Sequence, residues 1–262
     1  MPDSLVLLTV ADRVARITLN RPAAGNALNA DLAAQLRARA AQVAERADVG
    51  VVVLDAAGPM FCVGGDLGWM AEQGDDVGAA LHALATDLHA ALESLCGMDA
   101  PVVAAVGGVA AGAGMSLVCA ADLAIASTAA KLTMAYTAAG LSPDGGSTWF
   151  LPRIVGQRRA AELMLTNRRL TAQEACELGI LTRVVAADAL GDEVDALARS
   201  LADGPAGAYG ATKRLLAGSG SSTLPDQLAA EADAISELGA AADGREGVAA
   251  FLGKRAPRFT GG

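Results

Sequence analysis

The chain has 262 residues, of which 53% are hydrophobic, 19% charged and only 3% aromatic. This length suits one large domain, or a core with a smaller appendage, and the apolar content excludes a wholly disordered chain. The 20 basic and 29 acidic residues leave a formal net charge of −9, which argues against a nucleic-acid-binding protein. No apolar stretch reaches the roughly 18 residues of a membrane span, and residues 1–13 lack the pattern of a signal peptide. We therefore expect a soluble, cytoplasmic protein with no membrane or nucleic-acid partner.

The cysteines and histidines do not indicate a metal or redox site. The four cysteines are far apart, and none forms a pair at the two-residue spacing of zinc or redox motifs. His82 and His89 are seven residues apart, which on a helix separates them by about 10 Å, too far to share one metal ion. We expect free thiols and no bound metal.

The first part of the chain predicts strands followed by a helix. Residues 5–10 and 14–20 are β-rich runs separated by three residues, so they predict a hairpin. Apolar residues near helical spacing predict a helix from about 30 to 46. Residues 51–54 then predict a short buried strand, and the glycine-rich segment 61–67 follows it.

A strand, a glycine-rich turn and a helix then occur a second time. Residues 79–96 have helical composition, and the apolar strand 102–106 runs into the glycine-rich segment 107–114 and a new apolar helix. The capping box Thr171-Ala172-Gln173-Glu174 predicts the start of a short helix that closes at Gly179, and 181–185 predicts a strand.

The rest of the sequence is helical. The pattern breaks at Gly204-Pro205 and in the glycine- and serine-rich segment 218–222, which has the composition of a hinge. Strands interleaved with helices, followed by helices alone, predict an α/β core with a helical C-terminal appendage. We place the core at residues 1–197 and the helical region at 198–262, with a boundary between about 195 and 205.

The two glycine-rich segments are candidates for an oxyanion site. Each follows a strand, and small residues there let backbone amides approach a ligand closely. Two amides from separate turns can converge on one carbonyl oxygen and stabilise the negative charge that develops on it. The alternative is that Gly112 and Gly114 only allow tight helix packing.

The order of the motifs resembles the enoyl-CoA hydratase/isomerase (crotonase) superfamily over nearly the whole chain. The matching segments are Asn20-Arg21-Pro22 with Asn26-Ala27-Leu28, Phe61-Cys62-x-Gly64-x-Asp66-Leu67, Pro101-Val102 through Gly107-x-x-x-x-Gly112-Ala113-Gly114, and Asp122. The resemblance implies a spiral of repeated β-β-α units, a helical C-terminal region that builds homotrimers or hexamers, and an acyl-CoA substrate of the kind found in fatty acid metabolism. Coenzyme A then arrives as part of the substrate, so no separate cofactor is implied.

The resemblance also implies which residues form the site. The two amides of the oxyanion hole match Gly65 and Ala113. By the same resemblance, Phe251 and Lys254 would reach the nucleotide of a neighbouring subunit. The residues implied in substrate and coenzyme A binding are Arg21, Ala23, Ala24, Val63, Gly64, Asp66, Leu67, Tyr136, Phe251 and Lys254.

The acid/base residues differ from those of the family hydratases, which are lyases that use two glutamates. The matching positions here are Ser116 and Tyr136. Asp144 matches the acid/base aspartate of the phenylacetate-degradation-type enoyl-CoA isomerases, to which the segments 140–146 and 244–255 are most similar. One carboxylate is sufficient to move a double bond, because it can remove a proton from one carbon and return it two carbons along. We therefore predict isomerisation of a 3-enoyl-CoA to a 2-enoyl-CoA, with His89 and Ser116 as possible accessory residues.

Other interpretations of the same residues are open. Asp144 could instead cap a helix that starts near Gly145. The chain could be a hydratase with non-standard acid/base residues, or a catalytically weak acyl-CoA-binding subunit. It could also be an aryl-CoA dehalogenase, since His89 matches a histidine of that branch, although Tyr136 stands where the branch has tryptophan; otherwise His89 is a partly exposed helix residue. A dinucleotide-binding reductase and a serine hydrolase are disfavoured, because the segment around Gly114 lacks the last glycine of either motif.

Overall fold

A six-stranded sheet in the order β1-β2-β3-β4-β6-β9 forms the centre of the computed structural model, which describes residues 4–261. The predicted hairpin is confirmed and consists of antiparallel β1 and β2, and the other four strands lie parallel to β2. All residues of β4 are buried, as expected for a parallel strand covered on both faces. The strands are β1 Val6–Ala11, β2 Val14–Leu19, β3 Val51–Ala56, β4 Val102–Val106, β6 Leu123–Ser127 and β9 Arg183–Val185.

A second sheet has three short strands that we did not predict. They are β5 Val109–Ala111, β7 Lys131–Thr133 and β8 Leu170–Thr171, in the order β5-β7-β8. β5 lies inside the second glycine-rich segment, so that segment is part strand and part turn. Pairing with residues far along the chain, rather than local composition, makes these segments strands.

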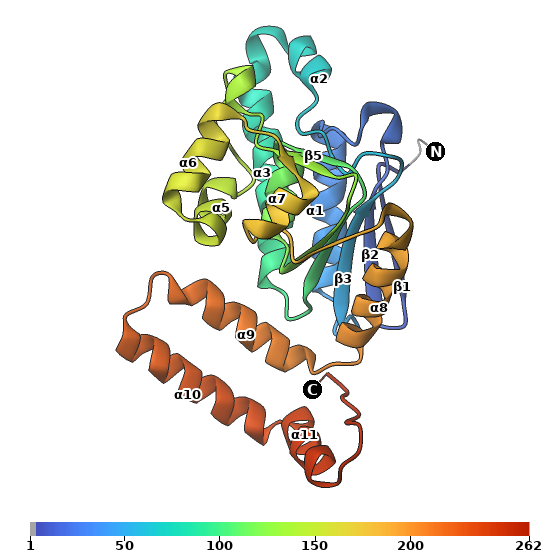
Figure 1. The fold of residues 1–262 in the computed structure, drawn as a ribbon, viewed down its shortest axis with the longest axis vertical. Coiled ribbons are helices and arrows are strands. Elements are labelled where there is room, and N and C mark those ends of the chain that lie inside the picture. The colour runs from blue at the N-terminus through green and yellow to red at the C-terminus, as the bar shows by residue number, and fades with distance from the viewer. Residues whose placement is uncertain (1–3, 262) are drawn as a thin grey trace.

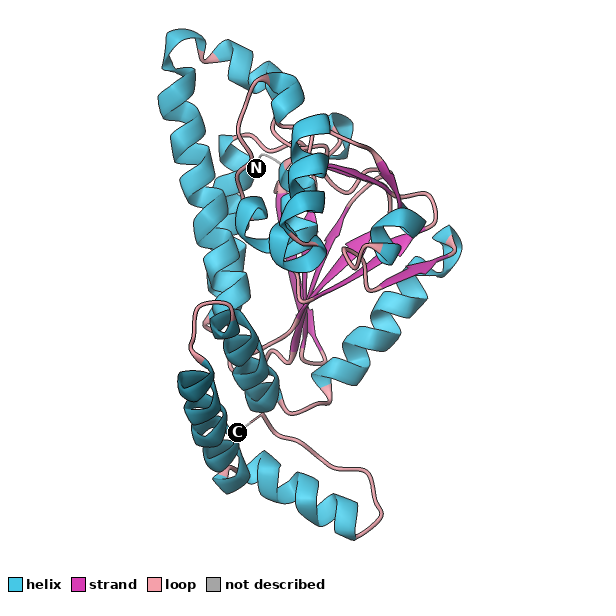
Figure 2. Cartoon of the chain, turned by 60° about the vertical axis from the view of Figure 1, so that its left-hand side comes forward, coloured by secondary structure: helices cyan, strands magenta, loops and turns pink. Residues whose placement is uncertain are grey.

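Helices cover both faces of the large sheet (Figures 1 and 2). On one face, α1 (Ala30–Ala44), α3 (Val77–Gly97) and α4 (Ala113–Ala120) share a core with alternate strand residues such as Val52 and Leu54. On the other face, α8 (Leu190–Ala202) packs against Val51 and Val53. This alternation follows from the two-residue period of a strand.

Shorter elements connect the core. The predicted capping box is confirmed: the Thr171 hydroxyl accepts the Glu174 N–H, and the Glu174 carboxylate accepts the Thr171 N–H. The shorter elements, of which α7 is the one that begins at the capping box, are η1 Pro22–Ala24, α2 Leu67–Glu72, η2 Gly74–Asp76, η3 Thr137–Ala139, α5 Ser147–Val155, α6 Gln157–Thr166, α7 Ala172–Glu177 and η4 Ala187–Ala189.

Three C-terminal helices extend away from the sheet (Figure 1). They are α9 (Ala206–Ser219), α10 (Leu224–Ala240) and α11 (Ala242–Leu252). The chain leaves the core at Gly204-Pro205, whereas position 197/198 lies inside α8, which packs on the sheet. The segment 218–222 ends α9 and turns into α10. Residues 1–3 of the predicted core and residue 262 of the predicted helical region lie outside the described residues.

No helix within residues 4–261 combines the length and the apolar character that crossing a membrane requires.

Candidate active site

The two glycine-rich segments lie side by side. The N–H groups of Phe61 and Cys62 donate to the Val109 carbonyl at 3.0 and 3.1 Å, and the Ala111 N–H donates to the Cys62 carbonyl at 2.8 Å. These bonds pair the segments in the manner of neighbouring parallel strands. The turn after β3 and the turn after β5 are therefore fixed relative to each other.

Two glycines allow this close approach. A Cβ atom on Gly114 would lie 2.2 Å from the Cys62 carbonyl oxygen, so the position leaves no room for a side chain. Gly112, at φ +51°, has the Cα of Gly64 and the Met134 carbonyl among its nearest neighbours. The close contacts are thus made with the other glycine-rich segment and with the loop after β7, so both glycines bring these segments close together.

Gly65 and Ala113 carry the two amides that are expected to form the oxyanion hole. Ala113 is the first residue of α4, so its N–H lies among the helix-terminal donors that make no intrahelical bond. Within residues 4–261, neither amide donates a hydrogen bond to another group. Both residues line one cavity of about 330 Å³, a size suited to a small ligand. The two residues expected to supply the oxyanion hole thus line one cavity, and the oxyanion hole itself stays a prediction.

The loop that carries Gly65 is held on both sides. The Leu28 N–H donates to the Gly64 carbonyl at 2.7 Å, and the Asp66 N–H donates to the Leu28 carbonyl at 2.8 Å. The Asp66 carboxylate accepts from the Trp69 N–H at the start of α2 and from the Arg21 guanidinium at 2.6 Å. The hydrogen bond from the Trp69 amide has the larger effect and the Arg21 guanidinium adds to it, so the pKa of Asp66 lies below its usual range. Arg21 and Asp66 therefore hold the loop that carries Gly65 in place.

Asn26 is a structural residue whose role the sequence did not reveal. It is fully buried, and its side-chain amide donates to the carbonyls of Ala57 and Met60 at 3.0 and 2.9 Å. Its side-chain oxygen accepts the Arg21 N–H at 2.8 Å. Asn26 thus ties the segment before α1 to the turn after β3. The motif Asn26-Ala27-Leu28 was the only signal for this role.

Asp144 lines the same cavity as the two amides and is held by a hydroxyl pair. The Tyr136 hydroxyl donates to Oδ1 of Asp144 at 2.5 Å, and Oγ of Ser116 lies 3.0 Å from the Tyr136 oxygen. Burial, together with the charge of Asp144, raises the pKa of the Tyr136 phenol, so the phenol stays protonated and donates. Ser116 and Tyr136, which the sequence resemblance matches to the two hydratase glutamates, therefore belong to one hydrogen-bonded group with Asp144.

The alternative that Asp144 caps a helix is wrong. Helix α5 begins at Ser147 after Gly146, and no side chain caps it. The backbone carbonyl of Asp144 accepts the Ser147 N–H at 3.2 Å, which leaves the carboxylate to Tyr136. Two consecutive glycines at positive φ turn the chain between Asp144 and α5 and separate the carboxylate from the helix end.

The remaining predicted residues divide into two groups. Val63, Gly64, Leu67 and Tyr136 line the cavity, together with apolar side chains of α2, α3 and the loop before α5, which the sequence did not single out. The apolar residues of α2 and α3 among them lie at a spacing typical of any amphipathic helix, so the sequence gave no sign that they line a cavity. The apolar lining residues that the sequence did not single out are Met70, Leu81, Leu84, Ala85 and Leu141.

The other predicted residues do not line the cavity. Ala23 and Ala24 lie in η1, whereas Phe251 lies near the end of α11 and Lys254 just beyond it, in the part of the chain that extends away from the sheet. Phe251 is 83% exposed. His89 is exposed on α3, where its Nε2 accepts the Gly145 N–H at 3.2 Å. The predicted contacts of Phe251 and Lys254 with a neighbouring subunit stay predictions.

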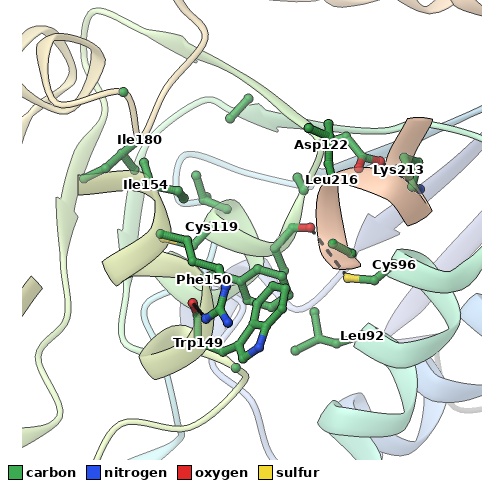
Figure 3. A pocket seen from close by; sticks show the side chains of 18 of the residues that line it. Leu92, Cys96, Cys119, Asp122, Trp149, Phe150, Ile154, Ile180, Lys213 and Leu216 are labelled. Carbon is green, nitrogen blue, oxygen red and sulfur yellow. Dashed lines mark hydrogen bonds and ion pairs between the residues drawn. The ribbon is translucent and has the colours of Figure 1, made fainter. Parts of the chain in front are cut away.

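A larger cavity of about 890 Å³ lies between the core and α9 (Figure 3). Burial raises the pKa of its thiols, Cys96 to about 11 and Cys119 to about 12, so neither is a ready nucleophile. An ion pair of Lys213 and Asp122, 2.9 Å apart, stands in its wall. Because this cavity contains neither of the two amides nor Asp144, the smaller cavity is the candidate active site.

Comparison with known proteins identifies the family. The family model described as enoyl-CoA hydratase/isomerase matches residues 9–262. The chain belongs to the enoyl-CoA hydratase/isomerase family. The family acts on acyl-CoA thioesters, and Gly65 and Ala113, whose amides donate to no group within residues 4–261, line the smaller cavity.

Relatives of this family member cover it almost completely. A "Probable enoyl-CoA hydratase" of Rhodobacter capsulatus is 40% identical over 96% of both chains. A "1,2-epoxyphenylacetyl-CoA isomerase" of Escherichia coli is 38% identical over 98% of both chains. The solved structure of an enoyl-CoA hydratase from Polaromonas sp. JS666 is 32% identical, covers 97% of this chain and 99% of its own, and superposes with a TM-score of 0.92. The crotonase fold expected from the sequence is therefore confirmed.

Proposed function

We propose that the protein is an enoyl-CoA isomerase that converts a 3-enoyl-CoA to the conjugated 2-enoyl-CoA, with Asp144 as its single acid/base. The observation that carries this proposal is the composition of one cavity: the residues of two unpaired amides, Gly65 and Ala113, line it together with one carboxylate. Within the described residues, Asp144 is the only acidic side chain among those that line this cavity.

The two amides stabilise the negative charge that forms on the thioester oxygen during the reaction. Removing a proton from the carbon between the thioester carbonyl and the double bond leaves a dienolate, whose charge rests partly on the carbonyl oxygen. Amides that already face this oxygen stabilise the charge without reorganising, and loss of one such donor costs about 2.7–4 kcal/mol in other enzymes. Two donors together therefore lower the barrier by several kcal/mol.

Asp144 supplies the proton transfer. Its carboxylate takes the proton from carbon two, and the resulting acid gives the proton to carbon four, so that the double bond moves and the enzyme returns to its starting state. The reaction neither consumes nor releases water. General acid/base groups of this kind contribute about 10²–10⁴-fold to a rate.

Hydration is the second candidate, and the relative from Rhodobacter capsulatus that is named as a hydratase favours it. Hydration needs one group to activate water and another to protonate the neighbouring carbon. The serine and tyrosine at the two glutamate positions are poor substitutes, because the Tyr136 phenol stays protonated. An acyl-CoA binder without turnover and a dehalogenase are further alternatives. The apolar lining suits an aliphatic or a ring-bearing acyl group.

Replacing Asp144 tests the proposal. We expect Asp144→Asn to bind acyl-CoA as the wild type does, by calorimetry, and to isomerise a 3-enoyl-CoA about 10²–10⁴-fold more slowly. Asp75→Asn, an exposed acid of η2 outside the cavity, is the matched control and should keep the wild-type rate.

The wild-type enzyme should also hydrate crotonyl-CoA much more slowly than it isomerises. An unchanged rate for Asp144→Asn would remove this residue from the mechanism, and fast hydration would reverse the choice of reaction. A wild-type protein that shifts its melting temperature with acyl-CoA but forms no product would be a binder.

A further inference from the structure

A chain of hydroxyl groups leads from α4 to the carboxylate of Asp144. Oγ of Ser116 lies 3.0 Å from the Tyr136 oxygen, which lies 2.5 Å from Oδ1 of Asp144. Ser116 is fully buried, and Tyr136 packs against the core while its side chain lines the cavity. The isomerisation mechanism so far gives neither residue a role.

The protons of the two hydroxyls fix the direction of this chain. A carboxylate only accepts, so the single proton of Tyr136 is donated to Asp144. The Ser116 hydroxyl then has only acceptors around it: the Tyr136 oxygen and the backbone carbonyls of Gly112 and Asp144, at 3.3 and 3.1 Å. The Ser116 hydroxyl has one proton for these three acceptors, and a bond between the two hydroxyls can run only from Ser116 to Tyr136, whose own proton goes to Asp144.

The two oxygens of Asp144 differ as a result. Oδ1 accepts the phenol hydrogen bond, whereas Oδ2 receives no hydrogen bond from residues 4–261 and is not among the buried unpaired oxygens. One oxygen is thus held by the protein, and the other is open.

The backbone around Tyr136 is constrained as well. Its N–H donates to the Met134 carbonyl at 2.7 Å and closes a three-residue turn around Ala135, which has φ +55°. A non-glycine residue in this region costs about 1–2 kcal/mol, so the surrounding structure enforces the turn. Ala135 and Tyr136 both line the cavity.

Helix α4 connects this chain to the oxyanion hole. Ala113, which offers its amide, and Ser116 are three residues apart on α4, so both lie on its first turn. A short helix is rigid over one turn. Ser116 and Tyr136 thus link the helix that carries the Ala113 amide to the carboxylate of Asp144.

We infer that Tyr136 is a positioning residue that acts through Asp144: its hydroxyl, oriented by Ser116, holds Oδ1 so that Oδ2 is the atom that takes and returns the proton. The inference rests on the proposed isomerisation. Without the phenol hydroxyl the carboxylate can rotate, and a misplacement of about 1 Å can cost on the order of 10²-fold in rate.

Tyr136→Phe tests the inference, because it removes the hydroxyl and keeps the ring that lines the cavity. We expect kcat for 3-enoyl-CoA isomerisation to fall about 10- to 100-fold while KM and the melting temperature stay close to wild type. Ser116→Ala should lower kcat less, because the phenol still donates to Asp144. Tyr209→Phe, at the other tyrosine of the chain, on α9, is the control and should keep wild-type kinetics.

The double variant shows whether Tyr136 acts through Asp144. Once Asp144 is replaced by Asn, adding Tyr136→Phe should change the remaining rate less than twofold. An equal loss in both backgrounds, or an effect on KM alone, would overturn the inference in favour of a direct substrate contact. If Asp144→Asn stops turnover but Tyr136→Phe keeps the wild-type kcat, only the inference is wrong. If Asp144→Asn isomerises normally, the proposed function is wrong and the inference falls with it.

Discussion

Single residues decide how closely the two glycine-rich segments approach each other. The nearest atoms to a Cβ on Gly114 would belong to the backbone and side chain of Cys62, which cannot move without shifting the turn that carries Gly65. The site depends on this contact because its two amides come from different turns. A helical glycine with nothing within 4 Å of its Cβ position, such as Gly78 on α3, carries no such constraint.

Gly114→Ala and Gly78→Ala should therefore act in opposite directions. We expect Gly114→Ala to destabilise the protein by about 1–3 kcal/mol through overpacking and to abolish turnover, since Ala113 moves with the turn. Gly78→Ala should leave turnover unchanged and stabilise by up to about 1 kcal/mol, because alanine favours a helix. Urea unfolding and the isomerisation rate measure both variants. A Gly114→Ala enzyme with normal stability and turnover would contradict the observed contact.

The sequence predicted the residues of the candidate site but not the contacts between them. The motifs predicted Gly65, Ala113 and Asp144, and all three line one cavity. The bond from Tyr136 to Asp144 could not be predicted, because it depends on where a three-residue turn places the ring. The buried role of Asn26 was missed for the same reason, since its partners lie over 30 residues away.

Secondary-structure elements follow the sequence where their signals are local. The helix predicted over 30–46 spans Ala30–Ala44, and the strand predicted over 102–106 has those bounds. The three strands of the small sheet were missed, because a strand of two or three residues is too short to show a period of alternating polarity. Helix α7 was predicted from its capping box, in which both reciprocal hydrogen bonds are present.

The capping box makes the stability of α7 depend on pH. The Thr171 amide and hydroxyl, followed by Arg168, lower the pKa of Glu174 from 4.5 to about 2. Since the folded-state pKa lies below the unfolded value, ionised Glu174 stabilises the protein above pH 4.5, and this contribution is lost as the pH falls toward 2. The stability difference between wild type and Glu174→Gln should thus be constant near neutral pH and shrink below it. A difference that grows on acidification, in urea titrations, would refute this.

At the scale of the whole molecule, the C-terminal helices expose apolar surface. Helix α10 buries none of its residues, and Ile235 on it is 75% exposed. Val248, Phe251 and Leu252 on α11 are exposed as well. Large apolar side chains exposed on neighbouring helices are typical of a surface that contacts another protein. The surface agrees with the proposal that the protein is a homotrimer or a hexamer, which no contact within one chain could reveal.

A charge placed on this surface tests the assembly. We expect wild-type protein to sediment as three or six copies, and Ile235→Lys to sediment as a smaller particle, because a lysine at a buried interface leaves an unpaired charge. Leu165→Lys, which replaces a similarly exposed residue on α6, is the control and should keep the wild-type mass. A wild-type monomer would contradict the proposed assembly.

The central claim is that two backbone amides and one carboxylate act on the same thioester, and a crystal structure with a bound acyl-CoA tests it most directly. We predict the thioester oxygen within about 2.7–3.2 Å of the amide nitrogens of Gly65 and Ala113, with Oδ2 of Asp144 facing acyl carbons two and four. A thioester oxygen bound elsewhere, or an Asp144 carboxylate turned away from the acyl chain, would contradict the claim.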